Sequence, residues 1–346
     1  KNESTVNICA LDISKAFDKI NQHCLLLQLS ERRLPVEFLL LFELWFTNIF
    51  IKVKWCESVS RFYRLKSGIR QGGILSPIVF AIYVDKIVSK LAQSGLGCYV
   101  KGFFSGMWLY ADDVVLLSAS VSHLQTMIQL CISEFDNLDL CVNVRKSNCI
   151  RIGKRFNARV SKLVICDEVV GWNKEIRYLG LTIKAGRVFR SLLHVNKQKF
   201  FRAANCILSR IGCKNVGVLT ALLSSKCFPI MLFGLSACAL NKSDKSKLDN
   251  SLDLILAKMF GTNNKGQCLY YCGHLPLSKQ YELMKMKFLT GLHSLYIVNL
   301  DYYFLMKSFD TSELQELFAI YNTNRMEPHG KRRFRVWVNF ELSLFN

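Results

Sequence analysis

Residues 107–117 read Met-Trp-Leu-Tyr-Ala-Asp-Asp-Val-Val-Leu-Leu, and this stretch decides the fold. Two adjacent carboxylates, Asp112 and Asp113, separate two apolar runs whose composition is typical of strands. The pattern predicts a tight hairpin with the acidic pair at its tip, where both side chains can project outward. Charged carboxylates in an apolar setting are costly unless a cation neutralises them, which makes the tip a candidate Mg²⁺ site. The alternative is an ordinary turn, because Asp is common in turns without any metal.

Two other stretches bear on this choice. A third carboxylate, Asp12, ends a short β-prone run near the start of the chain, and at a strand end facing the tip it would complete a metal site. Between the two, residues 67–77 read Ser-Gly-Ile-Arg-Gln-Gly-Gly-Ile-Leu-Ser-Pro. The glycines allow close approach of backbone to a substrate, and Gln71 offers both a donor and an acceptor. Ser76 followed by Pro77 predicts a helix with Ser76 as its N-cap.

The order of these motifs resembles the palm of a reverse transcriptase. It runs from Asp12, with Phe17 five residues later, through the Gln-Gly and Ser-Pro loop to Tyr-Ala-Asp-Asp at 110–113. Arg70 before the glutamine and Asp18 after Phe17 are most similar to the enzymes of non-LTR (LINE-type) retrotransposons. The resemblance is strong over residues 11–183 and looser as far as residue 304.

The resemblance implies a two-metal nucleotidyl-transfer site. Asp12, Asp112 and Asp113 would hold two Mg²⁺ ions, for which Mn²⁺ is a substitute, and the backbone carbonyl of Ile13 is a further candidate ligand. Lys146, in the run 141–147, would serve as general acid or charge partner of the departing pyrophosphate. The alternative for Lys146 is a solvated surface lysine.

The resemblance also implies contacts to substrate and primer. Phe17 would be the steric gate against a ribose 2′-OH, although a core aromatic is the alternative. The remaining substrate-binding candidates are Gln71, Gly72 and Tyr110. The predicted primer grip comprises Tyr178, Leu179 and Gly180, for which the alternative is a half-buried strand.

Composition favours a large folded chain with a polyanionic partner. The 346 residues are 51% hydrophobic and 21% charged, and the formal net charge is +20. Residues 145–214 contain 17 Lys and Arg against 3 Asp and Glu, which favours nucleic acid. The 14 cysteines, without a secretory signal, predict a reduced, intracellular protein. Cys268, Cys272 and His274 cluster, but without a second pair we favour buried thiols over zinc.

The expected fold is α+β: a right-hand polymerase palm, made of an antiparallel sheet backed by helices, with partial fingers and a helical remainder. We expect palm and partial fingers over 1–183, a helical thumb over 184–262, and a helical C-terminal region with a solvated basic tail over 263–346. Helices are predicted at 19–34, 36–48, 78–92 and 121–138, paired strands at 50–55 and 61–65, and a polar link at 242–247. The apolar run 216–240 is interrupted by Lys226 and Pro229, which predicts two packed helices rather than a membrane span.

The predicted function is RNA-directed DNA synthesis for a non-LTR retrotransposon. Its partners would be an RNA template, a DNA primer or target and dNTPs, within a ribonucleoprotein of the nucleus and cytoplasm. Because the chain begins with Lys1 just before its first motif, we expect a fragment without the upstream fingers. One alternative is therefore a catalytically inactive remnant that only binds nucleic acid. Another palm polymerase, such as an intron-encoded enzyme or an RNA-templated RNA polymerase, is less favoured, because Phe17 and the Gln71 loop favour DNA synthesis. The sequence leaves the oligomeric state open.

Overall fold

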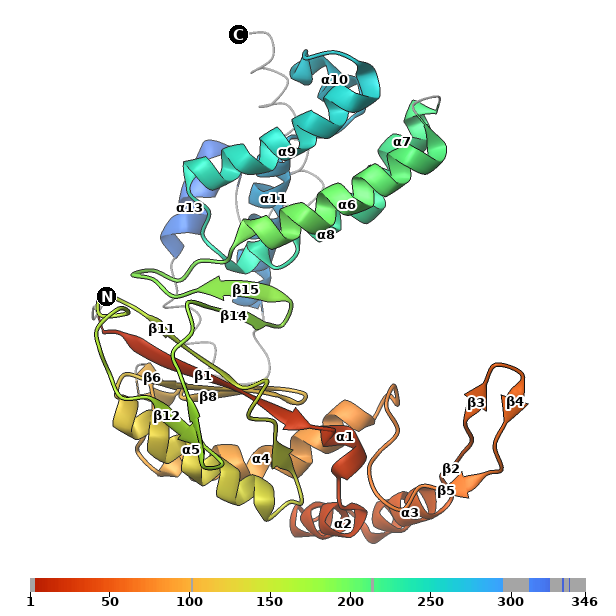
Figure 1. Cartoon of the computed structure of the whole chain (residues 1–346), viewed down its shortest axis with the longest axis vertical. Coiled ribbons are helices and arrows are strands. Elements are labelled where there is room, and N and C mark those ends of the chain that lie inside the picture. The colour runs from red at the N-terminus through yellow and green to blue at the C-terminus, as the bar shows by residue number, and fades with distance from the viewer. Residues whose placement is uncertain are drawn as a thin grey trace. The chain divides into compact units, whose positions relative to one another are not determined.

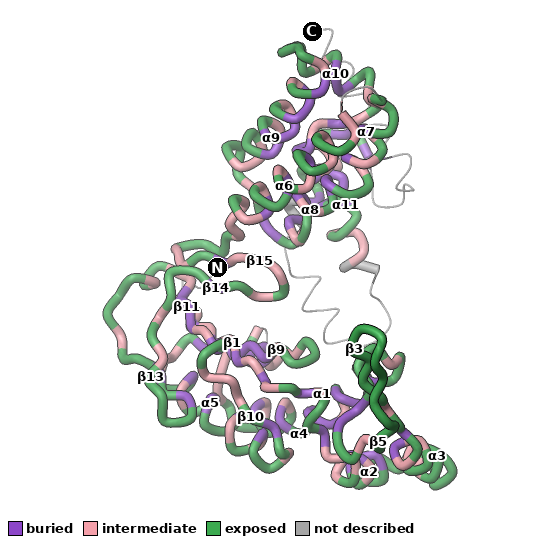
Figure 2. Tube along the Cα trace, turned by 45° about the vertical axis from the view of Figure 1, so that its right-hand side comes forward, coloured by how far each residue is buried: buried purple, intermediate pink, exposed green. Residues whose placement is uncertain are grey.

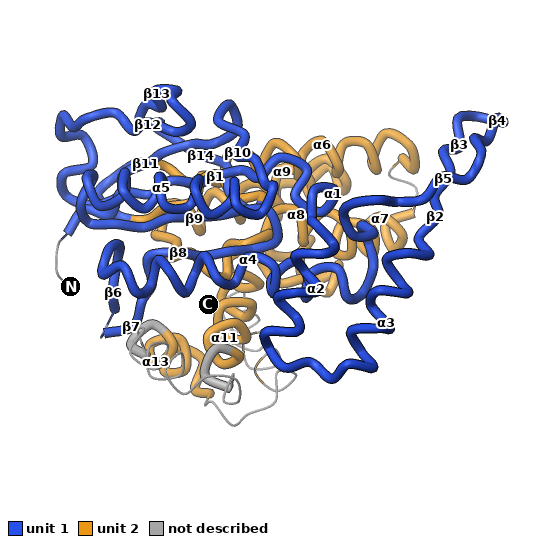
Figure 3. Tube along the Cα trace, turned by 90° about the horizontal axis from the view of Figure 1, so that it is seen from below, with its two compact units in different colours: residues 1–179, 185–188 blue, residues 180–184, 189–346 orange. Residues whose placement is uncertain are grey.

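The chain forms two compact units. The computed structural model describes residues 4–100, 102–212, 215–294 and 311–323, together with Arg332 and Val336. The first unit contains residues 1–179 and 185–188, and the second contains 180–184 and 189–346 (Figure 3). The expected boundary between thumb and C-terminal region, at residue 262, stays a prediction.

An antiparallel five-stranded sheet forms the centre of the first unit. Its middle strand β1 (Val6–Ser14) pairs on one side with β9 (Asp113–Ser118), which in turn pairs with β8 (Met107–Tyr110). On its other side β1 pairs with β10 (Cys141–Val142) and β11 (Asn148–Ile152). Every second residue of β1 is buried, which gives the strand one face toward the core and one face with partial access to solvent.

Two long helices cover the buried face of this sheet (Figure 1). They are α4 (Ser76–Gln93) and α5 (Val121–Asp136), and both confirm the predicted amphipathic helices. The buried side of α5 consists of Leu124, Met127, Ile128, Cys131 and Phe135. These side chains share one core cluster with Cys9, Leu11 and Ile13 of β1. The resulting α+β architecture, an antiparallel sheet backed by helices, is the one expected.

The helix predicted over 19–34 is confirmed as one shorter helix, and its predicted bounds are wrong by three residues at each end. A short helix α1 (Ala16–Lys19) is followed by α2 (Gln22–Glu31), and α3 (Val36–Thr47) follows as predicted. The later start has a local cause: the side chain of Asn21 accepts hydrogen bonds from the backbone N–H groups of His23 and Cys24, which caps the start of α2.

Short hairpins make up the rest of the first unit. The paired strands expected at 50–65 form an arm in which β2 (Phe50–Ile51) pairs with β5 (Tyr63–Arg64), and β3 (Lys54–Trp55) pairs with β4 (Ser58–Val59). The arm extends from α3 and is mostly exposed (Figures 1 and 2). The other short strands are β6 (Tyr99–Val100), β7 (Phe103–Phe104), β12 (Leu163–Ile165), β13 (Glu168–Val170) and β14 (Glu175–Tyr178).

In its described residues, the regular structure of the second unit is helical apart from β15 (Leu181–Lys184). Its described helices are α6 (Leu193–Ile211), α7 (Val216–Leu222), α8 (Phe228–Leu232), α9 (Lys242–Phe260), α10 (Lys265–Tyr271), α11 (Leu277–Ser294) and α13 (Thr311–Ile320), with a π-helical turn at Leu223–Cys227 and a 3-10 turn at Leu235–Ala237. Along α6, Phe200 and Ala204 are buried whereas Lys199, Arg202 and Arg210 are exposed. This is the amphipathic pattern that the sequence predicts for a helix with a basic outer face.

Two details of the second unit differ from expectation. The predicted polar link at 242–247 is wrong, because α9 already begins at Lys242, where the Asn241 side chain accepts from the Asp244 N–H. The predicted basic tail at 331–335 lies outside the described residues except for Arg332. Arg332 is buried and donates to Thr290 Oγ1 over 3.1 Å, so a solvated position is wrong for this residue.

The prediction of two packed helices for the apolar run 216–240 is wrong. The helix α7, the π-helical turn Leu223–Cys227 and α8 follow one another without a break from Val216 to Leu232, and Pro229 lies in the first turn of α8. Among the described residues, no helix has both the length and the apolar character needed to cross a bilayer.

Candidate active site

The β8–β9 hairpin carries the acidic pair, as predicted. Tyr110 pairs with Asp113, so Ala111 and Asp112 form a two-residue turn between the strands. Ala111 has a φ of 53°, whereas Asp112 has a negative φ, and this combination corresponds to a type II′ turn. The positive φ is unusual for alanine and adds strain at the tip. Tyr110 is 65% exposed beside this turn.

The structure brings Asp12 next to this tip. In the pairing of β1 with β9, Asp12 lies directly opposite Asp113, and the Ile13 N–H donates to the Asp112 carbonyl over 3.4 Å. Residues directly opposite in an antiparallel pair direct their side chains to the same face of the sheet, about 5 Å apart at Cβ. Because Leu11 and Ile13 are buried in the core, Asp12 lies on the opposite, accessible face. Asp12 is therefore a neighbour of the acidic pair, although about a hundred residues separate them in the sequence.

The neighbouring charges change the acidity of the site. Burial raises the pKa of Asp113 above its ordinary value of 3.8, and the negative charges of Asp112 and Asp12 raise this pKa further. Such a carboxylate is more costly to ionise than one in solvent, and a nearby cation lowers that cost. The cluster therefore has the electrostatic character of a cation site.

In the metal-free protein, we expect Asp113→Asn to stabilise the fold at neutral pH. The pKa of Asp113 is higher in the folded than in the unfolded chain, so the folded protein resists ionisation of this carboxyl group. The group does not lower the free energy of unfolding below about pH 3.8, and it lowers that free energy increasingly as the pH rises through the raised pKa. Urea unfolding in EDTA from about pH 4 to 7 measures this effect. The free energy of unfolding should fall with rising pH in the parent chain, and it should fall less in the variant. Asp167→Asn, in the exposed turn after β12, is the control. Identical pH dependence in the parent and Asp113→Asn would contradict the assignment.

The turn at residues 143–147 places a cation beside Asp12. The Asn143 N–H donates to the Asp12 carbonyl over 2.8 Å, and the Asp12 N–H donates to Ser147 Oγ over 3.3 Å. These bonds attach the turn to β1 and bring Lys146 Nζ to 3.5 Å from Asp12 Oδ2. The Lys146 side chain is 69% exposed, so this ion pair contributes little stability and the ammonium can move toward another anion. Ser147 is not among the residues predicted from the sequence, since nothing local indicates its contact with a residue 135 positions away.

The donor chemistry of the three carboxylates suits a hard divalent cation. Carboxylate oxygens are the ligands that Mg²⁺ prefers, and the shared face of Asp12 and Asp113 puts two of them side by side. In the described ranges, no three His, Cys, Asp or Glu side chains are arranged as a complete metal-ligand set. The residues therefore fit Mg²⁺ by chemistry and register, and they would have to share it with water or substrate oxygens.

Phe17 and the glycine-rich loop pack against each other near this edge. The Ile69 N–H donates to the Phe17 carbonyl over 2.8 Å, and the Phe17 ring lies 5.1 Å from the Phe80 ring of α4. Gly68 has a φ of +80°, and a Cβ on it would lie 2.7 Å from the Phe17 carbonyl oxygen and 2.8 Å from Asp18 Cα. Only glycine therefore allows this close approach. Phe17 itself is half-buried, with one side supported by the core.

Gln71 and Gly72 lie in the exposed part of that loop. The Gln71 Nε2 donates to Asp18 Oδ1 over 3.1 Å, a contact that the sequence did not predict. Gly72 has a φ of +80° with open space around it. The prediction of Ser76 as an N-cap is wrong by one position: Leu75 is the N-cap, and Ser76 Oγ donates to the Arg70 carbonyl instead. That bond attaches the loop to the first turn of α4.

The predicted primer-grip residues are divided between the units. Tyr178 belongs to the first unit, where burial and the negative charge of Asp113 raise its pKa. The Tyr178 hydroxyl is therefore near the acidic cluster. Leu179 and Gly180 both have positive φ, at 45° and 81°, as a type I′ turn requires. In the second unit, a Cβ on Gly180 would lie 2.9 Å from the Phe233 ring.

The cysteine and histidine cluster has structural contacts. Cys268 is buried, and the Thr220 hydroxyl lies 3.8 Å from the Cys272 sulfur. His274 Nε2 is 3.4 Å from the Thr220 carbonyl, and its ring packs edge-on against Phe228. These contacts connect the residues directly after α10 to α7 and α8.

Comparisons with known proteins identify the family of the chain. The family model described as "Reverse transcriptase (RNA-dependent DNA polymerase)" matches residues 1–183. The chain is 25% identical over 173 residues to the "Retrovirus-related Pol polyprotein from type-1 retrotransposable element R2" of Nasonia vitripennis, covering 50% of this chain and 17% of that protein. It is also 25% identical over 198 residues to the "RNA-directed DNA polymerase from mobile element jockey" of Drosophila funebris, covering 53% and 20%. The chain thus spans about a fifth of the length of these relatives.

Among solved structures, the apo telomerase of Candida tropicalis is similar at a TM-score of 0.43 and 15% identity, covering 92% of this chain and 53% of the telomerase chain. The Candida albicans telomerase in complex with a fragment of telomeric RNA gives a TM-score of 0.40 at 12% identity, covering 88% of this chain and 50% of that chain.

Proposed function

The chain belongs to the reverse transcriptase family, which is a family of nucleic-acid-binding polymerases, and we propose that it catalyses RNA-templated DNA synthesis for a non-LTR retrotransposon. The pairing of Asp12 with Asp113, beside Asp112, carries this proposal, because nucleotidyl transfer needs clustered carboxylates at a strand edge. The similarity to the R2 and jockey proteins supports the non-LTR assignment.

We assign the metal ligands of the reaction to Asp12, Asp112 and Asp113, with the Ile13 carbonyl as a further ligand. Two Mg²⁺ ions, or Mn²⁺ in their place, supply charge neutralisation at the attacking and leaving oxygens when bound. Lys146, 3.5 Å from Asp12, is then the general acid or charge partner of the leaving pyrophosphate. Its exposed ammonium suits this role, because it can exchange the Asp12 carboxylate for a phosphate oxygen.

The other predicted residues would position the substrates. We propose that Phe17 excludes a ribose 2′-OH, that Gln71, Gly72 and Tyr110 contact the incoming nucleotide and its template base, and that residues 178–180 support the primer. The partners in this proposal are an RNA template, a DNA primer or target and dNTPs, in a ribonucleoprotein of the nucleus and cytoplasm.

The second unit offers a basic surface that supports nucleic-acid binding by a thumb. A cavity of about 400 Å³ is lined by Lys184, Arg190, His194, Lys197 and Lys247, together with the acidic Asp244. With the exposed basic face of α6, this surface suits the backbone of a primer–template duplex.

Primer extension tests the proposal. The chain is given an RNA template with an annealed DNA primer, in Mg²⁺, in Mn²⁺ or in EDTA, and with either dNTPs or rNTPs. We expect extension with dNTPs and a metal, and none in EDTA. Extension with rNTPs alone would favour a different palm polymerase. Tight RNA binding without extension under any condition would support the alternative of a catalytically inactive nucleic-acid-binding remnant.

Substitution of Phe17 tests the gate. We expect Phe17→Val to raise the ratio of rNTP to dNTP incorporation by about tenfold, because the smaller side chain leaves room for the 2′-OH. Phe104→Val makes the same change at a half-buried ring of the β6–β7 hairpin and should leave the ratio unchanged. If both variants only lose stability, Phe17 is a core aromatic and not a gate.

A further inference from the structure

A second basic pocket lies in the first unit, at the end of β1 opposite to the carboxylates. It has a volume of about 670 Å³, and its lining includes Asn7, Arg151, Lys154, Arg155 and Arg159. Among the described residues that line it, four are cationic and none is acidic. Asn7 precedes Asp12 by five residues on β1, which at about 3.3 Å per residue places the pocket about 17 Å from the catalytic edge. Asn7 and Asp12 also face opposite sides of the sheet.

The floor of the pocket is a fixed guanidinium. Arg151 is 6% exposed; its Nε donates to Asn7 Oδ1 over 3.0 Å, and its NH1 donates to the Ala158 carbonyl over 2.7 Å. Asn7, 1% exposed, is itself held by donating to the Ser118 and Ala119 carbonyls. The Trp172 ring lies 5.7 Å from the guanidinium. Burial lowers the pKa of Arg151, so an anion at this position would stabilise the charged form.

The wall of the pocket is also held in a defined conformation. Gly153 has a φ of +134°, and a Cβ on it would lie 2.5 Å from Thr5 Cα. The Arg155 N–H donates to Thr5 Oγ1 over 2.9 Å. These contacts hold the segment 153–160, with its three exposed cations, against the start of β1. The charges are therefore presented by an ordered surface, and less entropy is lost when a ligand binds.

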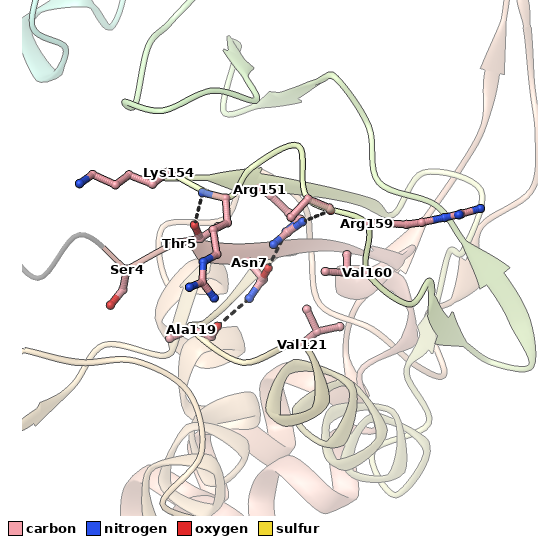
Figure 4. A pocket seen from close by; sticks show the side chains of 11 residues that line it. Ser4, Thr5, Asn7, Ala119, Val121, Arg151, Lys154, Arg159 and Val160 are labelled. Carbon is pink, nitrogen blue, oxygen red and sulfur yellow. Dashed lines mark hydrogen bonds between the residues drawn. The ribbon is translucent and has the colours of Figure 1, made fainter.

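The arrangement of the charges indicates the ligand. Lys154 and Arg159 extend to opposite sides of the Asn7–Arg151 pair (Figure 4), so the cations form a row. A row of cations suits a linear polyanion better than a single phosphate. No aromatic side chain is among the described lining residues, so the pocket offers no platform for stacking a nucleotide base. Both observations favour recognition of a backbone over recognition of a free nucleotide.

We propose that this pocket binds the phosphate backbone of a single nucleic-acid strand, at a position separate from the segment being copied. Arg151 with Asn7 forms the fixed floor, and Lys154, Arg155 and Arg159 contact successive phosphates. The inference deepens the proposed function, since a polymerase that anchors its nucleic acid at a second position keeps it bound between catalytic cycles. Binding here does not require catalysis, so it can be tested independently.

The test is a charge reversal of the two outer cations in the full chain. For Lys154→Glu combined with Arg159→Glu, fluorescence anisotropy should show about a tenfold or greater loss of affinity for a single-stranded RNA. The slope of log affinity against log salt should fall in magnitude by about 1.4, since each lost contact on a single strand contributes about 0.7. Both positions are exposed, so the fold should be retained, which circular dichroism and thermal unfolding verify.

The control variant carries the same change of charge at two lysines outside the pocket. Lys242→Glu combined with Lys287→Glu alters two exposed lysines of the second unit and should change neither affinity nor slope to that extent. A DNA strand of the same sequence should lose affinity in parallel if the backbone is recognised. Equal losses in the control pair would overturn the proposal, and so would displacement of RNA by adenosine monophosphate, which would indicate a free-nucleotide site. Extension of a short, pre-annealed primer–template should be unaffected in the pocket variant, so loss of the anchor is distinguishable from loss of the polymerase site.

Discussion

Replacement of Asp112 by Asn is expected to reduce template-directed incorporation by about 10³-fold or more, while RNA affinity is retained. The amide is nearly isosteric but lacks the charge that holds a divalent cation, and loss of charge stabilisation in the transition state costs this order of rate. Asp112 lies in the two-residue turn and is exposed, so the fold should be retained without its charge. The measurement is single-turnover primer extension, with RNA binding determined in parallel by anisotropy.

The matched control is Asp167→Asn. Asp167 is an exposed aspartate in the turn after β12, with a φ of 63° that Asn also tolerates. We expect its incorporation rate to equal that of the parent chain. Activity of Asp112→Asn within a few fold of the parent would refute the two-metal assignment. A parallel loss of RNA binding would instead indicate a folding defect.

Gly68→Ala is expected to lower the free energy of unfolding by about 3 kcal/mol, a large effect for one added methyl group. The added Cβ would occupy a position 2.7 Å from the Phe17 carbonyl oxygen and 2.8 Å from Asp18 Cα, both of which are backbone atoms. A backbone φ of +80° adds strain for any residue with a Cβ. Relief of the clash would separate the loop from α1 and break the Ile69 N–H bond to the Phe17 carbonyl.

Comparison with Gly72→Ala separates the cost of backbone strain from the cost of a steric clash. Gly72 has the same φ of +80°, but nothing lies within 4 Å of the position that an added Cβ would take, so only the conformational cost of about 1 kcal/mol applies. Urea unfolding of the two variants measures the difference. Because Gly68 supports Phe17, Gly68→Ala should also alter the selection of dNTPs over rNTPs. Gly72→Ala should leave this selection unchanged if Gly72 contacts the substrate through its backbone. Equal destabilisation of the two variants would contradict the packing described for Gly68.

Several elements of the fold follow from local chemistry and were predictable. The hairpin at 107–117 has two β-rich runs around a two-residue turn, and the helices α4 and α5 have apolar faces at helical spacing. The predictions failed where a single side chain decides the residue at which a helix begins. Asn21 caps α2 three residues after the predicted start of this helix, and Asn241 caps α9 where a polar link was predicted. Both helix starts depend on hydrogen bonds, and the amino-acid composition does not show that these bonds form.

The candidate site divides in the same way. The identity of its carboxylates and of the Gln-Gly loop could be proposed from residue types and their order. The contacts among them depend on strand register: a slip of one residue between β1 and β9 would turn Asp12 toward the buried helices. The Asp12–Ser147 bond, the Gln71–Asp18 bond and the Arg151 pocket likewise join distant positions.

The amino-acid sequence by itself determined which family this chain resembles, which carboxylates are candidates for metal binding, and that its strong positive charge favours a polyanionic partner, because residue type, spacing and net charge are properties of the chain alone. Only the tertiary structure decided that Asp12 and Asp113 share a face, that Gly68 has no room for a side chain, and that four cations surround a pocket with no acidic residue in its described lining. The physical reason is that strand pairing and core packing select one register among several that local preferences allow, and proximity between distant residues exists only after that selection.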